Sequence, residues 1–298
     1  MERLMENLRK YGIPYVKDCP LAERSSFRIG GCTQLAVFPD NRESLVKTLE
    51  LLSGSDVPFL TVGNASNLVF PDGGISGAVV FTTHCRGTVL SHDRIRAEAG
   101  TSLRKLAVTA CEAGLEGLEF AHGIPGTLGG ALVMNAGAYG GSMSDVCVSS
   151  TYYDLQTGRV CCVEGDAHEF GYRSSFYHHN SHCVILEAEL KLMPGRREDI
   201  RAQMAELEQK RKSSQPLEFP SAGSVFKRPE GYFAGKLIQD CGLKGLTVGG
   251  AQVSEKHAGF IVNRGGATAG DVRALVALIQ ATVLERFGVE LECEICFF

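Results

Sequence analysis

The feature that most constrains the fold of this chain is a glycine-rich stretch at residues 114–141, where nine of 28 residues are glycine. The whole chain has 35 glycines in 298 residues. Glycine allows positive φ and lets main-chain N–H groups approach a ligand, and successive N–H groups in such turns bind anions. Interleaved apolar side chains argue against disorder. The stretch therefore indicates a phosphate-bearing ligand, with tight turns that bind nothing as the alternative.

A second loop, residues 63–67, follows an apolar run at residues 58–62 that predicts a strand. This loop and the glycine-rich stretch could together wrap one pyrophosphate. Neither the dinucleotide fingerprint nor the P-loop pattern occurs in the chain, so no fold can be argued from those motifs. Ordinary tight turns are an equal alternative for this loop.

The bulk composition limits the partners and the compartment. The length of 298 residues suits two domains, and a net charge of −4 without a long basic run argues against nucleic acid as a partner. The first residues are charged, and no apolar run approaches the roughly 20 residues that span a bilayer. We therefore expect a cytoplasmic monomer without membrane insertion.

Eleven cysteines are scattered along the chain without the spacing of metal ligands. A lone Cys-x-x-Cys at residues 293–296 and the adjacent pair at residues 161–162 lie in apolar, strand-like sequence. Reduced thiols that pack as small hydrophobic groups explain them better than zinc ligands or disulfides do. We therefore expect no metal site.

Hydrophobic periodicity predicts the order of helices and strands. Strand patterns at residues 146–153, 159–163 and 184–192 precede a charged helix pattern at residues 197–212. Residues 289–296 alternate apolar and acidic, which predicts a last strand with its three glutamates on one face. The division that we expect is an N-terminal helical segment at 1–20, a domain at 21–195 with lobes at about 21–85 and 86–195, a linker helix at 196–215 and a C-terminal domain at 216–298.

Three residues outside the glycine loops could take part in chemistry. Ser224 precedes the basic pair Lys227-Arg228, so it could donate a proton beside an anionic ligand, or the segment could be a solvated turn. Arg173 lies between aromatic residues and could face a carboxylate or enolate, or could pack by its stem. Glu294 could point into a cleft or lie on a solvated strand face.

Eight segments of the chain are specific when they are taken together and in order. They are Ser26–Gly31, Gly63–Leu68, Gly117–Gly141, Tyr172–Phe176, Ser221–Pro229, Ala234–Ile238, Gly249–Ala258 and Leu291–Glu294. Their order and their sequences resemble those of the UDP-N-acetylenolpyruvoylglucosamine reductase family of bacterial cell-wall synthesis, over almost all of residues 20–296. The short interval between Arg173 and Ser224 is similar to the group that lacks an extra substrate loop.

The resemblance implies an α+β fold. A two-lobed FAD-binding domain of the vanillyl-alcohol-oxidase (PCMH) type would be followed by an α+β substrate-binding domain. It implies non-covalent FAD that NADPH reduces, and hydride transfer from flavin N5 to the enolpyruvyl double bond of UDP-N-acetylglucosamine enolpyruvate, which gives UDP-N-acetylmuramate. The enolate left by hydride addition needs stabilisation and a proton.

The resemblance also implies roles for single residues. Ser224 would be the general acid, and Arg173 and Glu294 would stabilise and orient the intermediate. The substrate contacts that it implies are Tyr139, Lys227, Arg228 and His257. The cofactor contacts that it implies are Gly63, Asn64, Ala65, Ser66, Asn67, Gly123, Ile124, Pro125, Gly126, Thr127, Gly129, Gly130, Asn135 and Ala136.

Three positions depart from the family pattern. Asn64 stands where glycine is usual, His122 where a small residue is common, and Ser214 where many relatives carry lysine. These departures bear on the affinity for FAD and for the diphosphate. Two other functions stay open on the sequence alone. One is another FAD-dependent oxidoreductase of the same cofactor fold, and the other is a flavin-binding module without catalysis.

Overall fold

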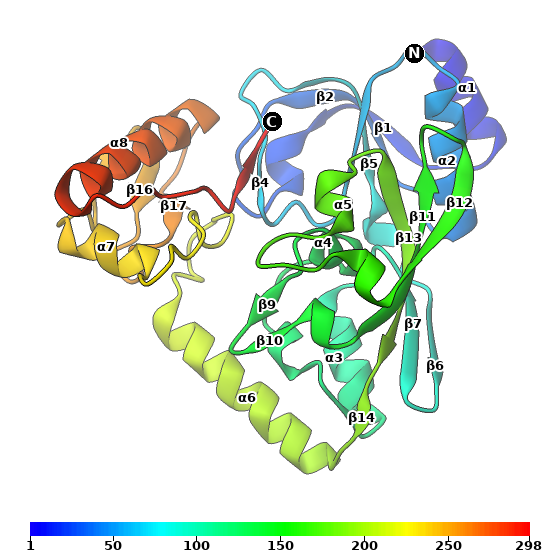
Figure 1. Ribbon diagram of the computed structural model, residues 1–298. Helices are drawn as coiled ribbons and strands as arrows, with labels where there is room; N and C mark the ends of the chain where they lie inside the picture. The colour runs from blue at the N-terminus through cyan, green and yellow to red at the C-terminus, as the bar shows by residue number, and fades with distance from the viewer. The chain divides into compact units, whose positions relative to one another are not determined.

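The computed structural model describes residues 1–298, which form two compact units (Figure 1). Unit 1 comprises Met1–Lys17, Leu35–Asn64 and Gly77–Lys210. Unit 2 comprises Asp18–Gln34, Ala65–Ser76 and Arg211–Phe298. The unit that contains the C-terminus therefore also contains two early segments of the chain.

The larger sheet of unit 1 has five antiparallel strands in the order β12-β11-β13-β7-β6. The strands are β6 (Thr88–Ser91), β7 (Arg94–Glu98), β11 (Cys147–Asp154), β12 (Arg159–Glu164) and β13 (Cys183–Lys191). The strands predicted after the glycine-rich stretch are thus confirmed. Because β11 lies between β12 and β13, both of its edges are hydrogen-bonded.

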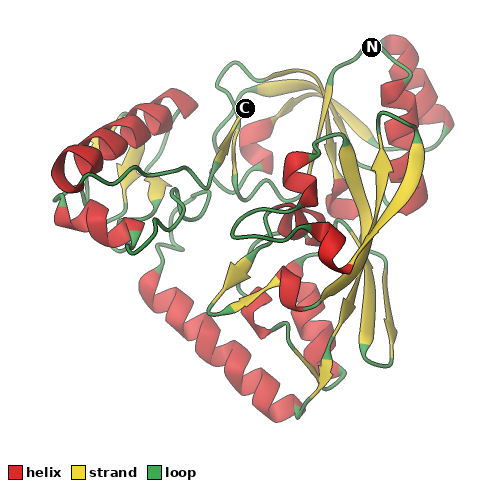
Figure 2. Cartoon of the chain, in the orientation of Figure 1, coloured by secondary structure: helices red, strands yellow, loops and turns green.

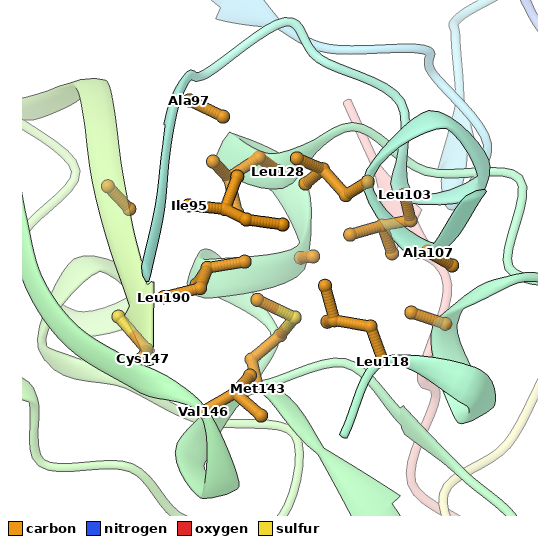
Figure 3. Close-up of a cluster of buried hydrophobic side chains, with 14 of the residues drawn as sticks. Ile95, Ala97, Leu103, Ala107, Leu118, Leu128, Met143, Val146, Cys147 and Leu190 are labelled. Atoms are coloured by element: carbon orange, nitrogen blue, oxygen red, sulfur yellow. The ribbon is translucent and has the colours of Figure 1, made fainter. Parts of the chain in front are cut away.

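Helices α3 (Leu103–Glu112) and α4 (Leu128–Val133) pack on this sheet through a buried apolar cluster (Figure 3). Ile95 and Leu190 of the sheet lie in one cluster with Leu103 and Leu128 of the helices. All four side chains are fully buried, and each contributes roughly 1.5–3 kcal/mol by leaving water. This packing fixes the start of α4, where the glycine-rich stretch turns into a helix.

A second sheet has the strand order β1-β2-β5-β3. Its strands are β1 (Tyr15–Pro20), β2 (Cys32–Val37), β3 (Phe59–Val62) and β5 (Ile75–Phe81), and it shares an apolar cluster with helices α1 (Glu2–Lys10) and α2 (Arg42–Ser53). At the start of α2, Asn41 Oδ1 accepts from Ser44 N at 2.8 Å, and Ser44 Oγ accepts from Asn41 N at 3.1 Å. Such a capping box satisfies otherwise unpaired N–H groups.

The helical segment expected at residues 1–20 is wrong in its second half. The helix covers only Glu2–Lys10, and residues 15–20 form the edge strand β1. Phe38 N donates to Pro14 O at 2.9 Å, which places the chain beside β2. An edge strand tolerates a proline such as Pro20 because one side needs no donor. Pro14 thus directly precedes β1, and Pro20 is its last residue.

The remaining elements of unit 1 are short, apart from α6 (Figure 2). They are η2 (Thr82–His84), β8 (Leu115–Glu116), η3 (Glu119–Ala121), β9 (Gly137–Ala138), β10 (Gly141–Ser142), η4 (Met143–Asp145), η5 (Gly165–His168), α5 (Phe176–His179), β14 (Met193–Pro194) and α6 (Arg197–Ser214). The charged helix predicted at residues 197–212 is α6. Its last residues, from Arg211 on, belong to unit 2.

Unit 2 is built on a small antiparallel sheet with the strand order β15-β16-β17 and two helices. Helix α8 begins with a capping box of Thr268 and Asp271 and ends at Gly288, where φ is 66°. None of the chain's helices combines the length and the apolarity that crossing a membrane requires. The elements are η1 (Leu21–Arg24), β4 (Leu68–Val69), α7 (Ala234–Asp240), β15 (Thr247–Val248), β16 (Ala251–Val253), β17 (Ile261–Asn263), α8 (Ala269–Phe287) and β18 (Cys296–Phe297).

The continuous last strand predicted at residues 289–296 is wrong. Only β18 is a strand there, and it pairs in parallel with β4. Just before β18, the N–H groups of Glu294 and Ile295 both donate to Val225 O, at 2.8 and 3.4 Å. Two donors on one carbonyl interrupt the ladder, and the chain then changes its partner to β4.

The three glutamates of this segment consequently do not share one environment. Glu290 and Glu292 are exposed, whereas Glu294 is half-buried. Leu291 and Ile295 are buried, so part of the predicted alternation survives without a continuous strand. The change of partner separates Glu294 from the two exposed carboxylates.

Candidate functional site

The two predicted cofactor loops of unit 1 meet at Gly63 and Thr127. A Cβ at position 63 would lie 2.1 Å from Thr127 Oγ1, so a side chain there would force a shift. Asn64 Nδ2 donates to Pro125 O at 2.7 Å and ties the loops together. Gly63 directly follows β3, and Thr127 is the N-cap residue of α4. The loops therefore form a close-packed cradle in which only glycine fits at position 63.

The start of α4 is fixed by main-chain bonds to the segment that follows β7. Leu128 N donates to Thr101 O at 2.9 Å, and Gly129 N donates to Ala99 O at 2.8 Å. A Cβ at Gly129 would lie 3.1 Å from that of Ala99, which explains the small residue. The Thr127 hydroxyl makes no capping bond. It is buried without a partner, although threonine hydroxyls usually cap at this position.

The far end of the glycine-rich stretch holds the turn that carries Arg173. Asn135 has φ of 39°, and its Nδ2 donates to Gly171 O at 3.0 Å. Its Oδ1 accepts from Ser144 N at 2.9 Å. The Asn135 side chain is thus used within the protein. Tyr139, with φ of 54°, is half exposed.

Arg173 lies in a tight turn whose ends bond to each other. Gly171 N donates to Ser174 O at 3.0 Å, and Ser174 N donates to Gly171 O at 3.3 Å. Arg173 has φ of 53°, in the left-handed region that costs a non-glycine residue energy. Its guanidinium donates to Gly137 O at 3.3 Å and lies 5.0 Å from the Tyr172 ring. The turn therefore aims a fixed cation along the end of the glycine-rich stretch.

In unit 2, the main-chain segments that carry Ser224 and Glu294 are hydrogen-bonded to each other at Val225. Ser224 pairs with Phe260 through an isolated bridge, and Val225 N donates to Gly259 O at 2.9 Å. On the other side, Glu294 N donates to Val225 O at 2.8 Å. Ser224 and Glu294 are both half-buried. The N–H and the C=O of Val225 thus hold the main chain at Ser224 and at Glu294.

Asn67 is the second support of Glu294. Its Nδ2 donates to Glu294 O at 3.0 Å, and its main-chain O accepts from Cys296 N at 2.9 Å. Ala65, two residues earlier, has φ of 46°. The side chain of Asn67, predicted to contact the cofactor, is therefore occupied within unit 2.

The predicted substrate residues of unit 2 have partners of their own. Lys227 is paired with Glu292. The Arg228 guanidinium carbon lies 3.9 Å from the Phe233 ring centroid, and Arg228 Nε donates to Tyr232 O at 3.3 Å.

His257 is also held by its neighbours in unit 2. Its Nδ1 accepts from Gly259 N at 3.1 Å, and its ring lies edge-on to Phe260 at 5.1 Å. Burial lowers the pKa of His257. The ring is therefore neutral near pH 7, and this histidine could act as a hydrogen-bonding group more readily than as a cation.

A family model for the C-terminal domain of UDP-N-acetylenolpyruvoylglucosamine reductase matches residues 215–298, and one for an FAD binding domain matches residues 33–163. The reductase of Clostridium perfringens (strain SM101 / Type A) is 46% identical over 278 residues, 93% of this chain and 91% of its own length. That of Caldanaerobacter subterraneus subsp. tengcongensis is 44% identical over 291 residues, 98% of this chain and 95% of its own.

This degree of identity over nearly the whole length decides the family. The chain belongs to the UDP-N-acetylenolpyruvoylglucosamine reductase family. The crystal structure of the reductase from Thermus caldophilus superimposes with a TM-score of 0.81 at 34% identity, covering 96% of this chain and 98% of that one. The predicted fold class and enzyme class, an FAD-dependent oxidoreductase, are confirmed. FAD, with NADPH as reductant, is the cofactor set of this reductase family.

The residues of unit 1 fit FAD on structural grounds. Gly63 leaves space beside Thr127 that a Cβ would fill. The hydroxyl oxygens of Thr61, Thr101 and Thr127 are buried without hydrogen-bond partners. A buried hydroxyl without a partner costs about 1–3 kcal/mol, and the phosphate or hydroxyl groups of a dinucleotide could satisfy it.

Thr61 and Thr101 escaped the sequence analysis. Each lies beside an element end rather than inside a glycine motif, and threonine is common in both settings. The absence of a partner distinguishes them only together with their place beside the cradle loops, because Thr151, inside β11, also lacks one. Thr101 stands in the sequence Gly-Thr-Ser that precedes α3, where Ser102 is the capping residue.

Proposed function

We propose that the chain reduces UDP-N-acetylglucosamine enolpyruvate to UDP-N-acetylmuramate with NADPH, in the synthesis of peptidoglycan precursors. The observation that supports the proposal is that Ser224 and Glu294 lie on main-chain segments joined at Val225, because a reaction that leaves an enolate needs a proton donor and groups that orient the intermediate. The curated relatives that bear the reductase name support the same assignment. The proposed division assigns FAD binding to residues 21–195 and substrate binding to residues 216–298.

FAD, when bound, would supply the hydride that it has taken from NADPH. Addition to the terminal carbon moves the electron pair of the double bond onto the carbon beside the substrate carboxylate. Ser224 Oγ would then give its proton to that carbon, so that the product gains two hydrogen atoms. Proton transfer by a positioned group typically contributes roughly 10²–10⁴-fold in rate.

Arg173 and Glu294 would stabilise and orient the enolate. A fixed guanidinium favours the negative charge that develops on the substrate, because preorganised cations need no reorganisation during the reaction. The left-handed turn and the bond to Gly137 O hold the Arg173 side chain in one direction. Glu294 would orient the Ser224 hydroxyl and the substrate, since its main chain is bonded to Val225, the residue after Ser224.

We propose Tyr139, Lys227, Arg228 and His257 as contacts for the UDP-sugar. Arg228 lies over the exposed Phe233 ring, and Lys227 adds a second positive charge at the neighbouring position, a combination suited to a diphosphate beside a ring. Binding would require Lys227 to exchange Glu292 for the ligand. We further propose that the enzyme is a cytoplasmic monomer.

The experiment that tests the function is turnover without oxygen. The holoenzyme is given NADPH and UDP-N-acetylglucosamine enolpyruvate, and the product is identified by mass spectrometry. The expected product is UDP-N-acetylmuramate, formed in proportion to the NADPH consumed. No consumption of NADPH with the UDP-sugar, together with oxygen consumption with a simple alcohol in a separate aerobic assay, would favour an oxidase of the same cofactor fold.

A flavin-binding module without catalysis predicts a third outcome. NADPH would reduce its flavin, and no enolpyruvyl substrate would reoxidise it. Such a result with correctly folded, FAD-loaded protein would contradict the proposed function. Mixing at several substrate concentrations separates it from weak binding, because weak binding gives a rate that rises with concentration.

A further inference from the structure

The segment that carries Arg173 is anchored at both ends on one buried hydroxyl in the middle of the larger sheet. Ser150 Oγ, on β11, lies 2.7 Å from His168 Nε2 and 2.6 Å from Tyr177 OH. His168 ends η5 before the Arg173 turn, and Tyr177 lies in α5 after it. The three anchoring side chains are at most 3% exposed. Residues 169–176 therefore form a loop that a single serine closes.

The hydrogen bonds of this network run in one direction. His168 Nδ1 lies 2.9 Å from Gly165 O, and a carbonyl only accepts, so Nδ1 carries the proton. Burial lowers the pKa of His168, which keeps the ring neutral and makes Nε2 an acceptor. Ser150 must then donate to His168, and its oxygen must accept from Tyr177. One hydroxyl thus serves both anchors. Apart from serine, only threonine carries a hydroxyl on Cβ that could do the same.

Aromatic packing fixes the two anchors in place. The rings of His168 and Phe170 stack at 4.9 Å with an angle of 3° between their planes. The Tyr177 ring lies edge-on to Phe176 at 5.3 Å and to Tyr152 at 5.8 Å. The rings cannot turn to find other partners without disturbing this packing. Loss of the Ser150 hydroxyl would therefore remove the bond to Tyr177 OH and leave His168 Nε2 only the longer contact with Cys147 Sγ at 3.7 Å.

The loop between the anchors contains two unfavourable backbone conformations. Glu169 has φ of 49° and Arg173 has φ of 53°. Residues in this region persist only where the surrounding structure over-determines them, at a cost of roughly 1–3 kcal/mol each. Asn135 and Gly137 hold the middle of the loop through Gly171 O and the Arg173 guanidinium. The Ser150 network holds its ends.

We propose that Ser150 is a positioning residue for Arg173. Its hydroxyl holds His168 and Tyr177, and these two hold the strained turn in the conformation that fixes the direction of the guanidinium. The inference rests on the role proposed above for Arg173 in the second half-reaction. It assigns a buried serine, remote from the glycine loops in sequence, to the geometry of the reaction.

The test measures the two half-reactions separately in the FAD-loaded enzyme without oxygen. Ser150→Ala removes both hydrogen bonds and is expected to slow flavin reoxidation by the enolpyruvyl substrate about 10- to 100-fold, since small misplacements of a positioning group have effects of this order. Flavin reduction by NADPH should be unchanged. Ser150→Thr keeps the hydroxyl and should restore most of the reoxidation rate.

A matched control lies next to Ser150 on the same strand. Thr151 Oγ1 is buried without a partner, so Thr151→Val removes a hydroxyl from β11 without touching the network. It is expected to leave both half-reactions as in the wild type. If Ser150→Ala does not fold, Tyr177→Phe removes one anchor only and should slow reoxidation by a smaller factor. A wild-type reoxidation rate in a folded Ser150→Ala or Tyr177→Phe, or equal losses in both half-reactions, would overturn the proposal.

Hydrogen exchange separates this proposal from the proposed function. The amides of residues 169–176 should exchange faster in Ser150→Ala than in Thr151→Val, because the loop ends are released. Arg173→Ala in the same kinetic assay tests the role of the arginine itself. If the amides of Ser150→Ala exchange faster while Arg173→Ala keeps the wild-type reoxidation rate, the catalytic role of Arg173 is refuted and the positioning of the loop by Ser150 stands. Unchanged exchange in Ser150→Ala refutes the positioning role of Ser150.

Discussion

The polar groups of the two candidate sites, one in each unit, differ in their hydrogen-bond partners. In unit 1, the hydroxyls of Thr61, Thr101 and Thr127 are buried without partners beside or near the glycine loops. In unit 2, the groups around Glu294 bond to one another, since Asn67 Nδ2 donates to Glu294 O and Glu294 N donates to Val225 O. Unit 1 therefore has groups that a ligand would satisfy, whereas unit 2 holds its groups in place without one.

This difference matches two physical tasks. A cofactor that stays bound can satisfy buried donors permanently, so the cost of leaving them unpaired in the free chain, about 1–3 kcal/mol each, reappears as cofactor affinity. A proton donor and an acid must keep their positions while substrate and product come and go. Internal hydrogen bonds give such preorganisation. Mutations in unit 1 should consequently affect FAD binding, and mutations in unit 2 should affect the second half-reaction.

The largest effect is expected at Ser224. Ser224→Ala removes the proposed proton donor and should slow flavin reoxidation by about 10³-fold, within the range of general acid catalysis. Flavin reduction by NADPH should keep its wild-type rate. Ser221→Ala, in the same segment, is the control and should leave both rates unchanged. Equal losses in both half-reactions of Ser224→Ala would refute the role of this serine.

The next effect is expected in the cradle of unit 1. Gly63→Ala places a Cβ 2.1 Å from Thr127 Oγ1, and overpacking of this kind costs about 1–3 kcal/mol. FAD affinity, measured by fluorescence titration of the apoprotein, should fall about 10- to 100-fold. Gly73→Ala is the control, because nothing lies within 4 Å of its Cβ. Wild-type affinity in Gly63→Ala would show that FAD does not use this cradle.

Two asparagines of one loop sharpen the comparison further. Asn67→Ala removes the bond to Glu294 O, worth about 1 kcal/mol, and should slow reoxidation several-fold with little change in FAD affinity. Asn64→Ala removes the bond to Pro125 O in unit 1 and should weaken FAD binding instead. Weaker FAD binding in Asn67→Ala together with slower reoxidation in Asn64→Ala, measured by the same titration and the same half-reaction, would contradict the proposed difference between the units.

A smaller effect concerns stability against acid. Burial lowers the pKa of His168 below its unfolded value of about 6.5. The contribution of neutral His168 to the free energy of unfolding is therefore complete above that pH. It is lost as the pH falls through the pKa of the folded chain, since the unfolded chain binds the proton more readily. Burial raises the pKa of Cys147 to about 12 and that of Tyr177 as well, so neither titrates in this window.

Urea unfolding at a series of pH values measures this effect. The midpoint should fall more steeply between pH 7 and pH 5 in the wild type than in His168→Gln, whose amide can still accept from Ser150. His257, whose pKa burial also lowers, accounts for a part of the slope that the variant should retain. Identical slopes in the two proteins would mean that His168 is protonated as readily in the folded chain as in the unfolded one.

The smallest effect is expected at an exposed ion pair of unit 2. Lys236 Nζ lies 2.5 Å from Asp240 Oδ1, with side-chain exposures of 63% and 36%. Exposed pairs of this kind contribute about 0.2–1 kcal/mol. Asp240→Asn should therefore change the free energy of unfolding by less than about 0.5 kcal/mol and should not alter either half-reaction. A larger loss, measured in urea, would show that α7 supports the site.

Local patterns predicted those elements whose signals lie within a few residues. The apolar runs of β11 and β13 and the charged helix pattern of α6 predicted these elements near their observed bounds. The last strand failed because Val225, almost 70 residues away, accepts two N–H groups and interrupts the ladder. No local pattern records such a partner.

The candidate site divides in the same way. Gly63, Thr127, Arg173, Ser224 and Glu294 could be named because their segments resemble a known family. Thr101 and Ser150 could not, because a hydroxyl in a strand or before a helix is ordinary in sequence. Only the folded chain shows that the Thr101 hydroxyl has no hydrogen-bond partner and that the Ser150 hydroxyl has two.

The most direct test of the account is a single turnover of the reduced holoenzyme. The flavin is first reduced with one equivalent of NADPH under anaerobic conditions, and UDP-N-acetylglucosamine enolpyruvate is then mixed in while the flavin absorbance is followed. We predict that the yellow colour of oxidised flavin returns and that UDP-N-acetylmuramate forms in equal amount. A flavin that stays reduced in the presence of saturating substrate would contradict the account.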